Sequence, residues 1–273
     1  MNGKIYLVAT PIGNLEDITL RALRILKEVD LIAAEDTRHT LKLLNHYQIT
    51  KPLYSYHRHN EEIKTDFLIE KVKEGQNIAI VSDAGTPVIC DPGEQIVKEA
   101  LKENIEVIPI PGACAFVNAL IASGLDTKEF CFYGFLSTNK KLKKEKLERI
   151  KTENKTIILY EAPHNLKTTL EEIKNIFGDR KVVIARELTK IHEEFIRGTL
   201  SEVIEKYTEP KGEHILLIEA NPENEKQIEE EIPIEILYKK YQEEGLSKNE
   251  IIKKIAKQKG VNKNEIYQKF IKK

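Results

Sequence analysis

The first 110 residues alternate short apolar runs with amphipathic stretches, and this alternation restricts the possible folds more than any other feature. The apolar runs occupy residues 5–9, 31–34, 53–56, 78–81 and 105–108. The stretches between them carry apolar residues at helical spacing. Strands that alternate with helices in this way predict an α/β domain with a mainly parallel sheet, covered on both faces, over residues 1–112.

Two further units follow this domain. Residues 113–222 contain five more apolar runs and two helical stretches, which predict a second domain of α/β or α+β character. Those runs lie at residues 131–135, 156–160, 182–185, 195–199 and 214–219. Residues 221–231 are polar and rich in acids, which predicts a linker. The last stretch, 232–273, holds three short segments with helical period and favours a helix-turn-helix-like module.

The composition is that of an ordinary globular protein. With 273 residues, of which 41% are apolar, the chain can bury a core and has the length of about two domains. Its cysteines, Cys90, Cys114 and Cys131, form no CxxC pair and have no histidine at metal spacing, so we expect neither a disulfide framework nor a bound metal. The most apolar later stretch, residues 114–125, is too short for a membrane helix. These features predict a cytoplasmic protein without a membrane span.

The segment VSDAGTPVICDPG, residues 81–93, predicts a ligand-binding loop. It follows a buried strand and precedes a helix, and open α/β sheets bind ligands beyond the carboxyl ends of their strands. Gly85 lets the backbone approach a ligand closely, while Pro87 fixes the backbone φ angle at its position. Asp83 and Thr86 are the expected polar contacts. An ordinary strand-to-helix turn is the alternative for this segment taken alone.

Two more loops have the same placement and a similar composition. Residues 10–14 (TPIGN) follow the first strand, and residues 111–115 (PGACA) follow the last strand of the first domain. The fingerprint GxGxxG is absent after the first strand, which disfavours NAD, FAD and nucleoside triphosphates. Each loop could be a structural turn, but three loops of one kind favour a ligand site.

Charged side chains gather at four strand ends, where charge beside a buried strand needs partners. They form the strings EDTRHT (35–40), YHRHN (56–60), YEAPH (160–164) and ARELTK (185–190). A helix cap by Asp36 or Thr37 accounts for part of the first string. Arg38 and His39 suit contacts with phosphate or ribose. For the two strings of the second domain, the alternative is an interdomain salt-bridge network.

Basic residues are concentrated in two places, although the net charge of the chain is only −1. Attraction to polyanions would therefore come from local patches. Residues 139–155 hold eight basic residues against three acidic ones, which fits either a phosphate-binding edge or a solvated helix. Residues 245–273 hold nine lysines against two glutamates. On a helix-turn-helix pattern, this charge favours nucleic-acid binding.

Six strings occur in order along the chain: VATPIGNL, AEDTRHT, SDAGTPVICDPG, PGACA, YEAPH and ARELTK. Over nearly the whole chain they resemble the tetrapyrrole methylase superfamily, and within it the methyltransferases that modify the 2′-oxygen of a cytidine in the decoding region of 16S ribosomal RNA. The resemblance implies a two-domain α/β enzyme, a homodimer, that binds S-adenosylmethionine in the cleft between its domains. The C-terminal module also resembles one that is appended in many members of this group.

The resemblance assigns the cofactor to the three loops described above. The implied cofactor-binding residues are Thr10, Pro11, Gly13, Asn14, Ser82, Asp83, Ala84, Gly85, Thr86, Pro87, Pro111, Gly112, Ala113, Cys114 and Ala115. Two positions depart from the family pattern. His164 is followed by Asn165 where the family commonly has arginine, which bears on one RNA contact. Cys114 replaces a small or polar residue, and cysteine is itself small and apolar.

Methyl transfer to a ribose hydroxyl requires that the hydroxyl be held in line with the methyl group and that water be excluded. The candidates for a base that removes the hydroxyl proton are Asp83, Glu161, Glu187 and His39, with no order among them. No metal is needed. The residues expected to bind 16S ribosomal RNA, naked or in the 30S subunit, are Arg38, His57, Arg58, Lys140, Lys141, Lys143, Lys144, His164, Arg186, Lys190, Lys254 and Lys263.

Two other functions fit parts of the sequence. A C-methyltransferase of corrin or porphyrin precursors would share the fold and the cofactor, but it has no evident use for a basic tail or for EDTRHT and YEAPH. A non-catalytic regulator that binds nucleic acid would use the tail but leave the three loops without a purpose. The RNA methyltransferase accounts for both features.

Overall fold

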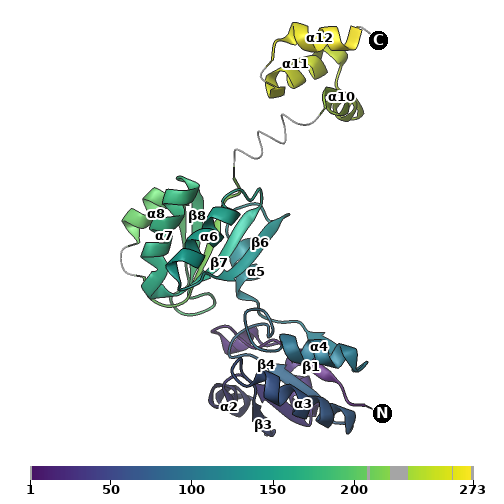
Figure 1. Cartoon of the computed structure of the whole chain (residues 1–273), viewed down its shortest axis with the longest axis vertical. Helices are drawn as coiled ribbons and strands as arrows, with labels where there is room; N and C mark the ends of the chain where they lie inside the picture. The colour runs from purple at the N-terminus through teal and green to yellow at the C-terminus, as the bar shows by residue number, and fades with distance from the viewer. Residues whose placement is uncertain (1, 208–209, 222–232, 260, 272–273) are drawn as a thin grey trace.

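The structure is a computed structural model that describes residues 2–207, 210–221, 233–259 and 261–271. Figure 1 shows the two sheet-containing domains one above the other along the long axis, joined near α5. The linker expected at residues 221–231 lies, apart from Asn221, outside the described residues.

The first domain is built on a parallel sheet of five strands in the order β3-β2-β4-β1-β5. The strands are β1 (Ile5–Val8), β2 (Leu31–Ala34), β3 (Leu53–Ser55), β4 (Ile78–Val81) and β5 (Val107–Ile110). The central strand β4 is buried along its whole length, as a parallel strand between two helical layers must be. The parallel sheet predicted from the alternation is therefore confirmed.

Helices cover both faces of this sheet. They are α1 (Leu20–Glu28), α2 (Thr37–His46), α3 (Glu61–Lys73) and α4 (Glu94–Lys102), with a 3-10 turn, η1 (Leu15–Asp17), before α1. Because successive strand residues point to opposite faces, Ala79 and Val81 join the core beneath α1 and α2. Ile78 and Ile80 join the core beneath α3 and α4. The turn η1 was not predicted.

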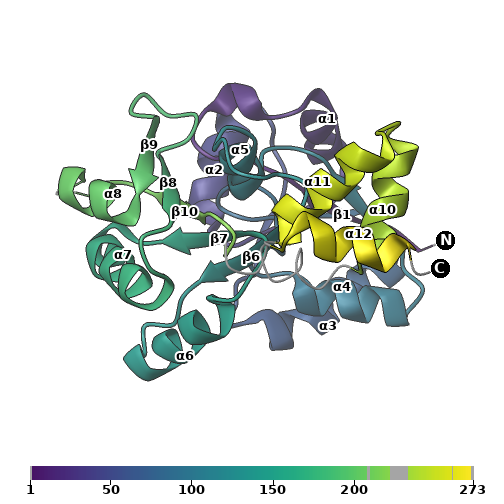
Figure 2. The same cartoon turned by 90° about the horizontal axis from the view of Figure 1, so that it is seen from above.

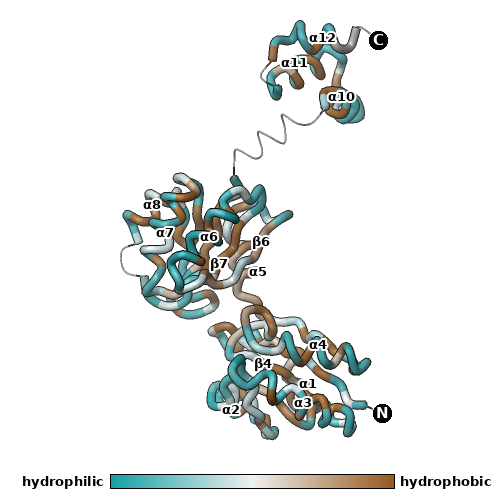
Figure 3. The backbone as a smooth tube through the Cα atoms, viewed as in Figure 1, coloured by the Kyte–Doolittle hydropathy of each residue, from teal (hydrophilic) through white to brown (hydrophobic). Residues whose placement is uncertain are grey.

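The second domain holds a mixed sheet of five strands in the order β6-β7-β10-β8-β9. The strands are β6 (Phe130–Phe135), β7 (Thr156–Glu161), β8 (Lys181–Arg186), β9 (Glu194–Thr199) and β10 (His214–Ile218). β6 pairs with β7 in parallel, and the other neighbours are antiparallel. Figure 3 shows apolar segments along the strands in the interior of the second domain. This arrangement agrees with the second α/β domain that was predicted.

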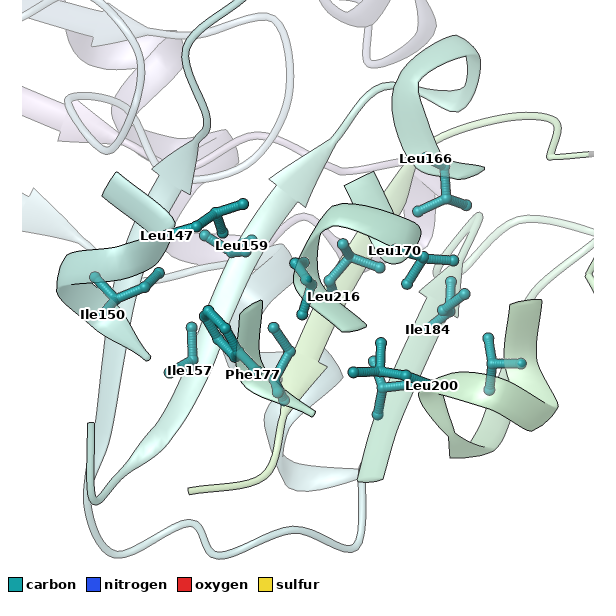
Figure 4. Close-up of a cluster of buried hydrophobic side chains, with 14 residues drawn as sticks. Leu147, Ile150, Ile157, Leu159, Leu166, Leu170, Phe177, Ile184, Leu200 and Leu216 are labelled. Carbon is teal, nitrogen blue, oxygen red and sulfur yellow. The ribbon is translucent and has the colours of Figure 1, made fainter. Parts of the chain in front are cut away.

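The two faces of the second sheet are covered unequally. The helices are α5 (Ala115–Ile121), α6 (Lys140–Ile150), α7 (Pro163–Phe177) and α8 (Leu200–Lys206). Leu147, Leu170 and Leu200 of the last three meet Leu159 and Leu216 of the strands in one core (Figure 4). Figure 2 shows α5 on the opposite side of the sheet from α6 and α7. The short helix α8 was not predicted.

Three helices form the C-terminal module, as expected: α10 (Ile234–Glu243), α11 (Lys248–Lys259) and α12 (Lys263–Ile271). They enclose a small core of their own, which includes Leu237, Tyr241, Ile252, Ile255 and Ile266. The module therefore has the internal packing of a separate folding unit.

Candidate active site

The three predicted loops meet at one edge of the first sheet. β4, β1 and β5 are neighbours in the sheet, so the loops that follow them leave from the same edge. The backbones of Thr10 and Gly85 exchange two hydrogen bonds of 2.9 and 3.0 Å. The hydroxyl of Thr86 donates to the carbonyl of Ala113 at 3.0 Å. The three loops are therefore hydrogen-bonded to one another and form one surface, which we call the floor.

Gly85 is required at its position in this floor. Its φ of +82° lies in the left-handed region, which glycine adopts without strain. A Cβ at this position would lie 3.0 Å from Cγ2 of Ile12. Close approach of the loops thus depends on the absent side chain.

A pocket with a volume of about 480 Å³ lies between this floor and the second domain. The first domain contributes Ile12, Glu35, Asp83 and Asp91 to its lining, among others. The second domain contributes Phe135, Tyr160, Glu161, Glu187 and His214, among others. A concave site with apolar walls and a few charged groups, placed between domains, is the usual form of a small-molecule site.

The carboxylates of the first-domain wall belong to two neighbouring strand ends. Glu35 follows β2, while Asp83 and Asp91 follow β4. Burial, and then the charge of Glu35, raises the pKa of Asp91 to about 6. Burial and the charge of Asp83 likewise raise the pKa of Glu35. A carboxylate whose pKa is near neutrality is suited to accept a proton at physiological pH.

Besides lining the pocket, the Asp83 side chain makes a hydrogen bond within the protein. Its Oδ1 accepts a hydrogen bond of 3.0 Å from the backbone N–H of Asp36. The side chain therefore ties the loop after β4 to the loop after β2. Its position in the pocket is fixed by this bond.

The two carboxylates of the second-domain wall are held by donors. The buried Glu161, at the end of β7, accepts from the Thr169 hydroxyl at 2.6 Å and from the N–H of Ala162 at 2.9 Å. Glu187 accepts from the N–H of Glu213 at 2.8 Å and from the Lys190 ammonium at 3.0 Å. The bond from Glu213, followed by that from Lys190, lowers the pKa of Glu187. Such donors stabilise the ionised form.

Most of the residues expected to bind the cofactor lie at the floor. Asp83, Ala84, Gly85, Thr86, Cys114 and Ala115 line the pocket. Thr10, Pro11, Gly13 and Ser82 line, together with Asp83, an adjacent hollow of about 240 Å³. The remaining residues, Asn14, Pro87, Pro111, Gly112 and Ala113, are not among the lining of either space. Asn14 instead caps η1 by accepting the N–H of Glu16.

The structure brings together three of the four predicted bases. Asp83, Glu161 and Glu187 line the same pocket, from both domains. His39 lines the adjacent hollow with Thr40 and Asp83 instead. His39 is therefore separated from the two carboxylates of the second-domain wall.

Several residues expected to bind RNA are accessible. His164, at the start of α7, is exposed, and so are Lys140, Lys141 and Lys144 of α6. Arg38 is exposed while its guanidinium pairs with Asp36 at 2.9 Å. These side chains are accessible to a phosphate backbone, although Arg38 would have to exchange its pairing with Asp36, and their role in RNA binding stays a prediction.

The cluster after β3 is partly engaged with the protein itself. Arg58 is exposed and donates to the carbonyl of Cys90. His57 is half-buried, and its Nε2 lies 3.0 Å from the side-chain amide of Asn60. Asn60 is the N-cap residue of α3 but makes no side-chain cap bond, so the cap expected from its type is absent. It accepts the backbone N–H of His57 instead, at 2.9 Å.

Lys143 requires a correction, because it does not belong to the exposed basic edge. Its side chain is only 11% exposed, and its ammonium lies 2.8 Å from the Glu172 carboxylate. The same ammonium donates to the Thr169 hydroxyl at 2.7 Å. Lys143 shares the inner face of α6 with Leu147 and Ile150. That helical spacing is the sequence signal that distinguishes it from its neighbours.

Arg186 and Lys190 are also bound within the protein. Nε of Arg186 donates to the carbonyl of Lys211 at 2.8 Å, and its Nη1 lies 3.2 Å from Glu194. The Lys190 ammonium lies 3.0 Å from both Glu187 and Glu213. These bonds form a salt-bridge network inside the second domain. The alternative considered from the sequence was a salt-bridge network between the domains.

Among the pocket residues to which the sequence reasoning assigned no role, four bear most on its chemistry. Glu35 and Asp91 lie inside the strings singled out above, but no role was assigned to them. Phe135 lines the pocket although its side chain is 61% exposed. His214 is buried, and burial followed by the charge of Arg186 lowers its pKa to about 4. The signal for Glu35 was its place directly after β2, and the signal for Asp91 was its place in the loop between β4 and α4.

In the C-terminal module, Lys254 and Lys263 differ in their surroundings. The Lys254 ammonium lies 3.2 Å from Glu244 and 4.1 Å from the centre of the Tyr241 ring. Lys263 begins α12 and is exposed. Their expected contacts with nucleic acid stay predictions.

The described part of the chain has neither a cluster of metal ligands nor a membrane-spanning helix. Within residues 2–207, 210–221, 233–259 and 261–271, no three His, Cys, Asp or Glu side chains are grouped as metal ligands. Over the same part of the chain, no helix has both the length and the apolar character needed to cross a membrane.

The fold is shared with solved structures of other proteins. The crystal structure of uroporphyrin-III-C-methyltransferase from Thermus thermophilus superposes with a TM-score of 0.56, at 20% identity, and covers 80% of this chain and 94% of that one. The crystal structure of diphthine synthase gives 0.61 at 16% identity, over 80% of this chain and 90% of that one. At these identities the likeness concerns the fold alone.

The chain belongs to the tetrapyrrole methylase family, because the family described as Tetrapyrrole (Corrin/Porphyrin) Methylases matches residues 4–204. It is therefore a methyltransferase. Within the family, it is similar to proteins named ribosomal RNA small subunit methyltransferase I. It is 56% identical to that of Halalkalibacterium halodurans over 223 residues, which are 81% of this chain and 77% of the relative. It is 51% identical to that of Bacillus subtilis over 253 residues, 92% of this chain and 87% of the relative.

Proposed function

We propose that this protein transfers a methyl group from S-adenosylmethionine to the 2′-hydroxyl of a cytidine in the decoding region of 16S ribosomal RNA. The observation that carries the proposal is the pocket of about 480 Å³, in which the three bonded loops face carboxylates of both domains. The names of the relatives support ribosomal RNA of the small subunit as the substrate. The nucleotide and the atom come from the resemblance of the six motifs.

The residues of the pocket fit S-adenosylmethionine. Ile12, Leu188 and Ile215 provide an apolar wall of the kind that suits an adenine ring. Several carboxylates face the same space, and they complement the positive charge of a sulfonium and an ammonium group. The cradle at Gly85, which a Cβ would fill, lets the backbone lie against a ligand. Thr10, Gly13, Asp83, Thr86 and Ala115 are the proposed contacts.

When bound, S-adenosylmethionine supplies a methyl group on a positively charged sulfur that leaves as a neutral thioether. The protein must hold the ribose hydroxyl in line with that methyl group and remove the hydroxyl proton. We assign the proton to the carboxylate of Asp91, whose pKa is about 6. Glu35 supports this role, because its charge contributes to that raised pKa. The bond between the hydroxyl oxygen and the methyl carbon forms as the proton moves to Asp91.

The accessible basic residues are the proposed RNA contacts. Arg38, Arg58 and His164 lie at the ends of strands or starts of helices, and Lys140, Lys141 and Lys144 extend the surface along α6. Lysine and arginine that neutralise phosphates supply affinity without reading sequence. Lys254 and Lys263 add contacts from the C-terminal module.

We further propose that the protein is a homodimer that acts in the cytoplasm. Val117 and Ile121 of α5 and Phe130 of β6 are exposed apolar side chains, and they suit burial against a second copy. Sedimentation velocity of the wild type and of Ile121→Lys tests this surface. We expect a dimer for the first and a shift toward monomer for the second.

The tetrapyrrole alternative and the regulator alternative make different demands on the C-terminal module. After deletion of residues 232–273, an RNA methyltransferase should still bind S-adenosylmethionine but should lose affinity for RNA. A tetrapyrrole methylase should keep its full activity on ring substrates. A regulator should show no methyl transfer before or after the deletion.

The deciding experiment is transfer of labelled methyl from S-adenosylmethionine to small ribosomal subunits from a strain that lacks this gene. The modified nucleoside is then identified by mass spectrometry. We expect label as 2′-O-methylcytidine. Cofactor binding without incorporation into RNA would overturn the proposal and favour the tetrapyrrole alternative.

A further inference from the structure

A buried polar chain leads from α6 to the pocket. The Lys143 ammonium on α6 lies 2.7 Å from the Thr169 hydroxyl on α7. That hydroxyl lies 2.6 Å from Oε2 of Glu161, the residue that ends β7 and lines the pocket. All three side chains are buried. Buried polar groups are held in place by such bonds, so the chain fixes the geometry of its last member.

The direction of each hydrogen bond in this chain follows from chemistry. An ammonium group can only donate, so the Thr169 oxygen must accept from Lys143. The single hydrogen of the hydroxyl then goes to Glu161. Thr65 on α3 shows the usual alternative, because its hydroxyl donates to the carbonyl of Glu61 in its own helix at 2.7 Å. Lys143 therefore holds the Thr169 oxygen in the position from which its hydrogen reaches Glu161.

Both oxygens of Glu161 are thus occupied by donors from the protein. Oε2 accepts from Thr169, and Oε1 accepts from the N–H of Ala162 at 2.9 Å. A carboxylate oxygen can accept more than one hydrogen bond. Glu161 is consequently a fixed acceptor in the lining of the pocket, with lone pairs left for a donor of a ligand.

Aromatic side chains lie next to this acceptor in the pocket. Phe135 and Tyr160 both line it, with ring centres 5.4 Å apart. Phe135 remains largely exposed, so its ring is available to a ligand. Enzymes that modify a nucleotide hold its base by stacking on aromatic rings and by hydrogen bonds to its Watson–Crick edge. An acceptor beside aromatic rings matches the amino group of cytosine, which is a donor at that edge.

We propose that Glu161 accepts a hydrogen bond from the amino group of the target cytosine, and that Thr169 and Lys143 are positioning residues that hold Glu161 for this contact. The proposal rests on the proposed function, since it assumes a ribonucleotide substrate. Uridine presents a carbonyl oxygen in place of the amino group, so the carboxylate of Glu161 repels it. Phe135 stacks on either base.

The test compares small subunits that carry cytidine or uridine at the modified nucleotide. For the wild type we expect kcat/KM to favour cytidine by about tenfold or more. Thr169→Val removes the donor to Glu161 at nearly constant volume and should reduce this preference to about threefold or less. Thr169→Ser keeps the hydroxyl and should retain the preference. Thr168→Val, at an exposed position of the same helix, is the matched control.

Two further variants keep the test decisive if Thr169→Val fails to fold. Lys143→Met frees the Thr169 hydroxyl and should lower the preference for cytidine, whereas Lys167→Met at an exposed position should not. Glu161→Gln should lose the preference, and Lys143→Met should then change it no further, because a positioning residue acts only through its partner.

The outcomes separate this inference from the proposed function. If wild-type protein methylates neither subunit, the proposed function fails. If it methylates both equally, or if Thr169→Val and Lys143→Met slow both substrates by the same factor, the inference is wrong while the function stands. Loss of preference in these variants, with retention in Thr169→Ser, supports it.

Discussion

The two walls of the pocket surround their carboxylates differently. On the first-domain wall, Asp91 and Glu35 are half-buried, and the charge of Glu35 acts on Asp91. Both pKa values are raised. On the second-domain wall, Glu161 and Glu187 each accept two hydrogen bonds from protein donors. We therefore propose that the same functional group exchanges a proton on one side and provides fixed recognition on the other.

The difference arises from how each wall is built. The first-domain acids follow parallel strands whose loops lie side by side, so like charges are brought together. The second-domain acids have donors close by: Glu161 is followed by the start of α7, and Glu187 faces Lys190 and Glu213. Backbone N–H groups and ammonium groups stabilise a carboxylate, whereas burial beside another acid destabilises it.

The strongest way to break this comparison is Asp91→Asn. Because the amide cannot take a proton, we expect kcat for methyl transfer to fall by about 100-fold, a typical contribution of a general base. In the wild type, the carboxylate is protonated as the pH falls through about 6, so activity should fall there and the variant should lack this limb. Asp66→Asn, at an exposed position of α3, is the control. A kcat within threefold or so of wild type would contradict the assignment of the base.

Asp83→Ala tests whether the first-domain wall also holds the cofactor. The change removes a carboxylate from the pocket and breaks the bond of 3.0 Å to the N–H of Asp36. We expect affinity for S-adenosylmethionine to fall by about tenfold or more, measured by isothermal titration calorimetry. Asp66→Ala should bind as the wild type does. Unchanged affinity of Asp83→Ala would exclude our placement of the cofactor loop.

Glu187→Gln sharpens the comparison from the other side. The loss of charge leaves Lys190 with Glu213 as its partner, so we expect the free energy of unfolding to fall by about 1 kcal/mol. Chemical denaturation measures this difference, with Glu205→Gln on the exposed side of α8 as the control. A loss of catalysis as large as that of Asp91→Asn, with stability unchanged, would show that Glu187 is a base.

The smallest effect concerns stability against pH. The pKa of Asp91 is about 6 in the folded protein, above the ordinary value of about 3.9 in the unfolded chain. Its contribution to stability is therefore full below about pH 4 and is lost as the pH rises through about 6. Denaturation of wild type and Asp91→Asn across this range should show their difference changing in this direction. A difference that does not vary with pH would mean that the carboxyl is not desolvated.

The sequence predicts regular elements where the local pattern decides them. Ile78–Val81 is apolar throughout and bounded by polar residues, so its place as a central strand is clear. The helix Leu200–Lys206 is only seven residues long and follows a strand directly, so its period was too short to separate from the strand. Its capping box, Thr199 with Glu202, was the available signal.

The site was predictable only in part, for a physical reason. The three loops could be found because glycine, proline and small polar residues mark them. The pKa of Asp91 is raised by burial and then by the charge of Glu35, which is distant in sequence and is brought near by the pairing of β2 with β4. Lys143 was grouped with its exposed neighbours because charge alone does not show which face of a helix points inward. Partners across the fold decide the case of Asp91, whereas the position on the helix, and not the residue type, decides that of Lys143.

The paired backbones of Thr10 and Gly85 have a consequence for the timescale of motion in the pocket. Each amide donates to the other residue's carbonyl, at 2.9 and 3.0 Å, in loops that would otherwise exchange amide hydrogens quickly. Both residues are buried. Their amides should therefore exchange with deuterium as slowly as those of β1 and β4, and the floor of the pocket opens only when the sheet itself opens.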